Sequence, residues 1–358
     1  MTLFFFALGL CALILGAELL VRGASRLALT FGISPLVVGL TVVAFGTSSP
    51  ELAISVQSAW SGQVDIALGN VVGSNIFNVL FILGLSALIT PLIVHQQLIR
   101  REVPLLIAVS VLLWGMAADG DIARWEGILL ALGLAAYIIY AIRASRRESA
   151  QITQEYAAAL PGDGSAWDRH WSVQTVLIVA GLLLLMQGSN WLVDSAVAIA
   201  RALGVSELII GLTLIAGGTS LPEVATSILA AFRGERDIAV GNVVGSNLFN
   251  ILGVLGISAA VAPASLTVSP SLLAFDLPVM VAVAVACLPI FFTGSLIARW
   301  EGGLFFAYYL AYTAYLILLS TRHEALATYS DVMVLFVLPL TAVTLVVLAA
   351  RHVQKTED

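Results

Sequence analysis

The chain has 358 residues, of which 60% are hydrophobic and 11% are charged. Soluble domains carry about 25% charged residues, so this composition excludes a water-soluble enzyme or binding domain and predicts an integral membrane protein. The net charge of −6 matters less than its placement, because basic loops orient membrane helices. We expect the lipid bilayer, and no nucleic acid, as the macromolecular partner.

Eleven apolar runs of roughly 20 residues predict eleven membrane-spanning helices and an all-α fold. In chain order they cover residues 3–21, 34–60, 65–90, 103–118, 123–142, 173–193, 206–232, 237–262, 272–293, 300–320 and 331–350. The runs form two groups of five and one extra helix. The predicted units are a first half at 1–142, a polar linker at 143–172, a second half at 173–320, and the extra helix at 331–350.

The basic residues predict the orientation of these helices. Thirteen of the 16 Lys and Arg residues fall on one set of sides, and three, Arg124, Arg201 and Arg322, fall on the other. Basic residues concentrate on the cytoplasmic side of a membrane. The pattern therefore predicts an outside N-terminus, a cytoplasmic C-terminus and a cytoplasmic linker, in the inner or plasma membrane of the cell.

An internal repeat links the two halves. GLTVVAFGTSSPELAISVQSAWSGQVDIALGNVVGSNIFN at 39–78 aligns without gaps to GLTLIAGGTSLPEVATSILAAFRGERDIAVGNVVGSNLFN at 211–250, with 25 of 40 positions identical and an offset of 172. Five helices per half is an odd number, so the second half must enter the membrane from the opposite side. Inverted repeats of this kind are typical of secondary transporters, which bind substrate between the halves near the bilayer midplane.

Each repeat places a proline directly before a glutamate in the middle of an apolar run. Proline has no N–H and clashes with the carbonyl four residues earlier. Pro50 and Pro222 therefore predict broken helices with freed carbonyls at Gly46 and Gly218. Breaks at membrane depth are tolerated where they face protein or a polar cavity, and such backbone oxygens suit a cation.

Polar side chains gather on one face around each break. Thr47, Ser48 and Glu51 lie within one helical turn, and Ser74 and Asn78 lie four residues apart in the next helix. The second repeat carries the corresponding residues Thr219, Ser220, Glu223, Ser246 and Asn250. This set holds oxygen donors without sulfur or imidazole, which favours Ca²⁺ or Na⁺ over zinc or copper. An ionised glutamate at the bilayer centre is costly, so a bound cation is its expected partner.

Neighbouring polar residues allow other interpretations. Asn75 and Asn247 either bond between helices or bind ions. Glu18, placed near the end of the first helix, could line an ion path, but capping at the membrane interface is favoured. Asp65 and Asp237 stand at predicted helix starts and are expected to be N-caps. Small residues four apart, expected to serve helix packing, are Gly69, Gly73, Gly241 and Gly245.

GTSSPELAIS with GNVVGSNIFN, and GGTSLPEVATS with GNVVGSNLFN, resemble the two α-repeats of the sodium/calcium exchanger family, within the cation/calcium antiporter superfamily. The resemblance covers about residues 1–320 and is similar in pattern to the bacterial calcium/sodium antiporters. The helix at 331–350 departs from that pattern. Some relatives, including the potassium-dependent branch, carry aspartate at the position of Asn250.

The resemblance implies one Ca²⁺ site and several Na⁺ sites, no cofactor, and a transporter for which a monomer suffices. The implied site consists of Glu51, Glu223, Thr47, Thr219, Ser48, Ser220, Ser74, Ser246, Asn78 and Asn250, with the carbonyls of Ala44 and Ala216. The implied mechanism is alternating access, in which the first and sixth helices slide across the other eight.

Na⁺/Ca²⁺ antiport is thus the expected function, and three alternatives stay open. A Ca²⁺/H⁺ antiporter of the same fold would use the glutamates as proton carriers, and H⁺ or other divalent cations would then be transported. A cation channel would pass ions far faster than a transporter. An intramembrane enzyme is disfavoured, because no histidine stands beside the glutamates and no nucleophile–base pair repeats.

Overall fold

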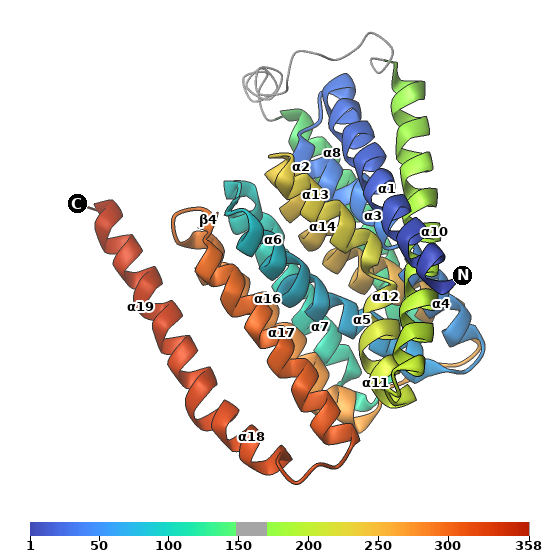
Figure 1. The fold of residues 1–358 in the computed structure, drawn as a ribbon. Helices are drawn as coiled ribbons and strands as arrows, with labels where there is room; N and C mark the ends of the chain where they lie inside the picture. The colour runs from blue at the N-terminus through green and yellow to red at the C-terminus, as the bar shows by residue number, and fades with distance from the viewer. Residues whose placement is uncertain (148–169, 358) are drawn as a thin grey trace.

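The computed structural model describes the backbone of residues 1–147 and 170–357 (Figure 1). In this part of the chain, nine helices are long and apolar enough to cross a bilayer, and the bent pair Pro35–Thr47 and Ser49–Trp60 would make a tenth. The chain is therefore a multi-helix integral membrane protein. The remaining predicted span, 206–232, is divided into shorter helices, and most of the predicted linker lies outside the described residues.

The described elements of the first half are α1 (Thr2–Phe31), α2 (Pro35–Val38), the π-helical η1 (Gly39–Val43), α3 (Ala44–Thr47), α4 (Ser49–Trp60), α5 (Val64–Phe77), η2 (Asn78–Leu83), α6 (Gly84–Ile89), β1 (Leu92–Ile93), η3 (Leu98–Glu102), α7 (Val103–Met116), η4 (Ala117–Asp119), β2 (Asp121–Ile122) and α8 (Arg124–Arg147). The second half and the extra helix contain α10 (Trp171–Ala202), α11 (Glu207–Ile210), η6 (Gly211–Ile215), α12 (Ala216–Gly218), α13 (Leu221–Phe232), α14 (Arg236–Phe249), η7 (Asn250–Leu255), α15 (Gly256–Val261), β3 (Leu266–Thr267), η8 (Leu272–Asp276), α16 (Leu277–Phe292), β4 (Leu296–Ile297), α17 (Arg299–Ser320), α18 (Leu326–Val332), η9 (Met333–Val337) and α19 (Leu338–Glu357).

The first helix of each half is longer than predicted. α1 continues to Phe31 instead of ending at residue 21, and α10 continues to Ala202 instead of ending at residue 193. The predictions followed the end of the apolar run, but a helix keeps its backbone hydrogen bonds after it leaves the apolar stretch. α1 stops at Gly32, which adopts the left-handed conformation (φ 61°) that glycine tolerates. Glu18 therefore lies inside α1, so its expected role as a cap at the helix end is wrong.

α1 and α10 lie side by side in opposite directions (Figure 1). Glycines make their close approach possible, since a Cβ added to Gly9 or Gly16 would lie 2.8 Å from the carbonyl oxygen of Gly188 or Gly181, respectively. Small residues of this kind let helix backbones pack closely inside a membrane. The two helices thus form a closely packed pair at one side of the bundle.

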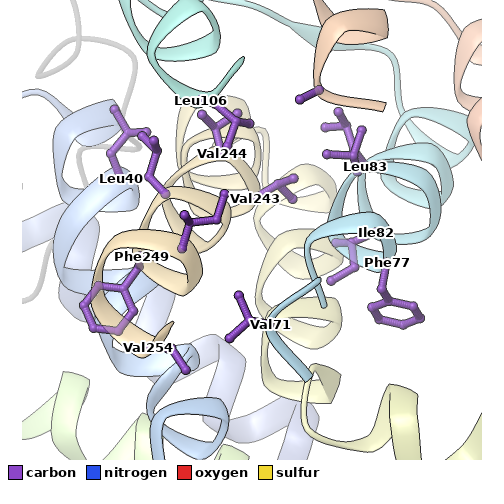
Figure 2. Packing of buried hydrophobic residues seen from close by; sticks show 14 of the residues in the cluster. Leu40, Val71, Phe77, Ile82, Leu83, Leu106, Val243, Val244, Phe249 and Val254 are labelled. Atoms are coloured by element: carbon purple, nitrogen blue, oxygen red, sulfur yellow. The ribbon is translucent and has the colours of Figure 1, made fainter. Parts of the chain in front are cut away.

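The core is centred on α5 and α14. Buried side chains of these helices, including Val71, Val243 and Val244, meet Leu40 of η1 and Leu106 of α7 (Figure 2). Short antiparallel strand pairs connect the two halves at their edges, with β1 against β4 and β2 against β3. The contacts that hold the halves together therefore run through the centre of the bundle and along two edges.

The predicted extra helix is present and longer than expected, because α18, η9 and α19 continue from Leu326 to Glu357. It lies at the outside of the bundle beside α17 (Figure 1). The hydroxyl of Tyr308 in α17 donates to Oγ1 of Thr341 at 2.6 Å, and that of Tyr329 donates to the carbonyl of Ala311 at 2.8 Å. These bonds attach an otherwise lipid-facing helix to the second half.

Candidate ion-binding site

The candidate site forms where two helices break. α3 and α4 meet at an angle of 48° at Ser48, and Pro50 stands in the first turn of α4, as the sequence predicted. α12 and α13 are likewise separated at Thr219 and Ser220, with Pro222 in the first turn of α13. Proline is tolerated in a first turn because the N–H that it lacks would have no helical partner there.

The breaks place a carboxylate at the N-terminus of each new helix. Glu51 lies in the first turn of α4, and Glu223 lies in the first turn of α13. Both side chains are 1% exposed. The positive end of a helix dipole stabilises a nearby negative charge, typically by about 0.3–1 kcal/mol, which offsets part of the cost of burying it. The fold therefore positions two buried carboxylates for a charged ligand.

Each carboxylate is bonded to the opposite half of the chain. Ser48 donates to Oε1 of Glu223 at 3.0 Å, and Ser220 donates to Oε1 of Glu51 at 2.9 Å. The Oγ atom of Ser220 also lies 3.3 Å from that of Ser74. The second oxygen, Oε2, of each glutamate is buried and has no hydrogen-bond partner in the described part of the chain. The two breaks thus form one shared cluster.

The predicted amide and hydroxyl donors join the same buried region. Asn78 and Asn250 are both 1% exposed, and each amide nitrogen is bonded across to the other half. Among the described residues, the side-chain oxygens of Asn78, Asn250 and Ser246 are buried without a partner. Unpaired buried acceptors are costly, and these three oxygens, with Oε2 of the two glutamates, are of the kind that a hard cation would bind.

Two of the backbone carbonyls that were predicted to face an ion already accept hydrogen bonds within the protein. The carbonyl of Gly218 accepts a hydrogen bond from Ser189 of α10 at 2.7 Å, so this proline-freed acceptor is already bonded. The carbonyl of Ala44 accepts the N–H of Ser48 at 3.0 Å. The surroundings of Ala216 lie outside what the structure describes. Ala44, Ala216 and Gly46 as ion ligands therefore stay predictions.

Sequence reasoning missed Asn70 and Asn242. The amide of Asn242 donates to Oγ of Ser227, and that of Asn70 donates to Oγ of Ser55, both at 2.9 Å. The Oγ1 atom of Thr47 lies 3.2 Å from Oδ1 of Asn242, so this asparagine touches a predicted ligand of the opposite half. A polar residue repeated at the same offset inside an apolar helix was the available signal.

The structure settles the roles of two pairs of neighbouring polar residues, one of which was predicted wrongly. Asn75 and Asn247 bond between helices, each amide reaching the other's carbonyl at 3.4 and 3.3 Å. Asp65 and Asp237 are not N-caps, because they lie within the first turns of α5 and α14. The N-caps are Gln63 and Glu235, and each lies two positions before the aspartate that was predicted.

The electrostatic partner of the carboxylates is not a basic side chain of the same helices. In the described helices α4, α5, α13 and α14, the one basic residue is Arg236 at the start of α14. It lies ten residues before Ser246. At 1.5 Å per residue this is about 15 Å along the axis. Among the described residues, no group of three or more His, Cys, Asp or Glu side chains could hold a metal ion. The site is instead two carboxylates supplemented by neutral oxygens.

Two buried carboxylates lie between two broken helices of a multi-helix membrane protein, and comparisons with known proteins show its family. Residues 1–143 and 173–318 match the sequence profile described as "Sodium/calcium exchanger protein". The chain therefore belongs to the sodium/calcium exchanger family.

Individual relatives support this membership. The chain is 32% identical to the sodium/calcium exchanger MaX1 of Methanosarcina acetivorans, over 85% of this chain and 95% of that protein. It is 40% identical to the inner membrane protein YrbG of Escherichia coli, over 77% and 84%. The fold matches the sodium-calcium exchanger NCX_Mj, soaked with 10 mM Na⁺ and zero Ca²⁺, with a TM-score of 0.73 and 31% identity over 87% of this chain and 98% of that one. The similarity therefore covers nearly the whole of these proteins.

Proposed function

We propose that this chain is a secondary antiporter that exchanges Na⁺ for Ca²⁺ at the cluster around Glu51 and Glu223. The observation that carries the proposal is that each glutamate bonds one oxygen to a serine of the opposite half and leaves the other oxygen buried and unpartnered among the described residues. Membership of the sodium/calcium exchanger family supports both ions as substrates. The relatives named as exchangers are transporters, which supports transport rather than catalysis.

The charge of the site suggests how the ions compete. Two carboxylates neutralise one Ca²⁺, whereas three Na⁺ at the same oxygens would leave one positive charge. An exchange of three Na⁺ for one Ca²⁺ would move one net charge in each cycle. A membrane potential contributes about 2.3 kcal/mol per charge per 100 mV, so it would help to drive Ca²⁺ export.

The proposed topology has eleven spans, two inverted halves at 1–142 and 173–320, an outside N-terminus and a cytoplasmic linker. The corresponding breaks at Pro50 and Pro222 and the unequal distribution of basic residues support it. The name of YrbG supports the inner membrane as the location. Ca²⁺, Na⁺ and lipid are the partners that this arrangement requires, and one chain contains the whole cluster.

Alternating access is supported by unequal covering of the two broken helices. A cavity of about 670 Å³ runs along α4 from Ser49 to Ser61 and reaches Ile257 of α15. The corresponding helix of the second half, α13, packs against α1. In the proposed topology α4 ends outside, so this state would admit ions from that side. Sliding of α1 and α10 would cover α4 and uncover α13.

The test is uptake of ⁴⁵Ca²⁺ into proteoliposomes that are loaded with Na⁺ and diluted into Na⁺-free buffer. We expect an outward Na⁺ gradient to drive uptake, and an inside-positive potential to speed it, because an exchange of three Na⁺ for one Ca²⁺ moves one positive charge out of the vesicle for each Ca²⁺ that enters. Uptake that ignores Na⁺ but follows an imposed pH difference would contradict the proposal and support Ca²⁺/H⁺ antiport. Discrete single-channel currents would support a channel instead.

A further inference from the structure

Four asparagines form a reciprocal set of bonds across the two halves: Asn75 of α5 and Asn247 of α14, and Asn78 and Asn250 at the starts of η2 and η7, which continue these helices. Asn250 donates its amide hydrogen to Oδ1 of Asn75 at 3.2 Å, and Asn78 donates to Oδ1 of Asn247 at 3.0 Å. The inner pair, Asn75 and Asn247, also donate to each other's main-chain carbonyl at 3.4 and 3.3 Å. All four side chains are at most 2% exposed. We call this set the amide lattice.

The lattice decides which end of a carboxamide faces the ion cluster. An amide has a donor end and an acceptor end, and its last torsion is only weakly restricted, so either end could face a ligand. In Asn78 and Asn250 the nitrogen is held by the inner asparagines. The Oδ1 atoms of both stay buried and without a partner in the described residues. An NH₂ group turned toward the cluster would repel a cation, whereas Oδ1 attracts it.

We propose that Asn75 and Asn247 are positioning residues, each of which orients the ion-binding amide of the opposite half. Asn75 sets the orientation of Asn250, and Asn247 sets that of Asn78. This inference rests on the proposed function, because it takes the free Oδ1 atoms to be cation ligands. It adds that the ion ligand of each half depends on an asparagine of the other half that does not itself bind the ion.

Simple helix packing would also explain the bonds, but it predicts a different pattern of coupling. If the lattice orients the ligands, Asn75 should be coupled to Asn250 on the other helix. It should not be coupled to Asn78, although Asn78 lies one turn away on the same helix. The corresponding coupling should join Asn247 to Asn78 and not to Asn250. Packing alone would couple residues by proximity, without this crossed pattern.

The experiment measures Ca²⁺ binding by calorimetry to the purified full-length protein in Na⁺-free buffer. Alanine replaces each asparagine singly and in the four pairs that combine an inner with an outer residue. Loss of a residue that orients a metal ligand typically costs about 10–100-fold in affinity, so each single variant should raise the Kd of Ca²⁺ about tenfold. The crossed pairs should stay near that single loss, whereas the same-helix pairs should approach the product of their two losses.

Two further variants separate orientation from folding. Asn75→Asp keeps the size of the side chain and the acceptor that Asn250 uses, so it should bind Ca²⁺ at least as tightly as the wild type. Ser110→Ala truncates another fully buried polar residue, on α7 and outside the lattice, whose hydroxyl donates to the carbonyl of Leu106 in its own helix, and it should leave the Kd unchanged. Thermal unfolding of each variant without ions gives the cost to stability separately from the change in Kd.

The outcomes distinguish the two proposals. If the wild type binds neither Ca²⁺ nor Na⁺, the proposed function fails, and this inference fails with it. If the wild type binds Ca²⁺ but the crossed and same-helix pairs are equally additive, the positioning role fails and the proposed function stands. An Asn75→Asp variant that binds as weakly as Asn75→Ala would also overturn the positioning role.

Discussion

α5 and α14 share the sequence GNVVGSN but lie in different surroundings. Ile66 near the start of α5 is 50% exposed, whereas its counterpart 172 positions later, Ile238, is 0% exposed. A Cβ added to Gly39 of η1 would lie 3.1 Å from the Cα atom of Ile238 in α14, whereas a Cβ added to its counterpart Gly211 of η6 has no described atom within 4 Å. α14 packs closely against α2, η1 and α3. The expected packing role is therefore confirmed for Gly241 and Gly245 of α14, and it stays a prediction for Gly69 and Gly73.

The comparison shows that identical segments can keep the same bonds between glutamate and serine while their packing differs. The Glu51–Ser220 and Glu223–Ser48 bonds differ by 0.1 Å in length. The outer contacts of the two repeats are not equivalent. A site formed between two halves can therefore stay symmetric while the surfaces that control access to it differ.

The largest expected effect tests the symmetric part. Glu51→Gln and Glu223→Gln should each abolish Na⁺-driven Ca²⁺ uptake, because either change leaves a divalent ion with one buried counter-charge. Removing one partner of a buried ion pair costs about 3–5 kcal/mol, or roughly 100–4000-fold in Ca²⁺ affinity. Uptake of ⁴⁵Ca²⁺ and calorimetric Kd values measure the loss.

Glu126→Gln is the matched control for the glutamates. Glu126 is also buried, but its carboxylate caps its own helix by accepting the N–H of Ala123 at 2.8 Å, a bond that glutamine can keep. Transport should survive in this variant. If one of the two site glutamates tolerates glutamine while the other does not, the equivalence of the two half-sites is wrong.

The second prediction concerns the packing difference. Gly245→Ala should destabilise the protein by about 1–3 kcal/mol, because the new methyl group would collide with the backbone at Leu40. Gly211→Ala on η6, where no described atom lies within 4 Å of the new methyl group, should leave stability unchanged or raise it slightly, since alanine favours the helix. Thermal unfolding in detergent and the yield of monodisperse protein measure both. Equal losses in the two variants would show that the two glycines are equally packed.

The smallest expected effect concerns an ion pair that one repeat has and the other lacks. Glu18 of α1 pairs with Arg233, directly after α13, whereas the counterparts of these residues are Asn190 and Ser61. Arg233 is 57% exposed, and exposed ion pairs contribute at most about 1 kcal/mol. Glu18→Gln should therefore lower the unfolding temperature slightly, and added salt should reduce the difference.

Charge reversal provides the control for this pair. Glu18→Arg combined with Arg233→Glu should restore the stability that either single change loses, while Asn190→Ala should have no effect. A double variant that is less stable than both single variants would show that other charges near α1 decide the outcome.

The cluster of polar side chains around Glu51 and Glu223 was predictable in large part because its signals are local. A proline before a glutamate predicts a broken helix wherever it lies in the membrane, and the spacing of Thr47, Ser48 and Glu51 places them on one turn. The amide lattice was not predictable in the same way. Whether Asn75 and Asn247 bond between helices depends on the register of α5 against α14, and residues 172 positions apart carry no local sign of that register.

The sequence by itself determined that the chain enters a membrane, where its helices break, and which oxygen-bearing side chains repeat around the breaks. These properties follow from composition, from the missing N–H of proline and from helical periodicity, all of which act within a few residues. The tertiary structure decided the rest: the pairing of each glutamate with the opposite serine, the bond from Ser189 to the carbonyl of Gly218, and the close packing of Gly245 against the backbone of Leu40. These contacts join distant segments, and their geometry depends on how whole helices pack.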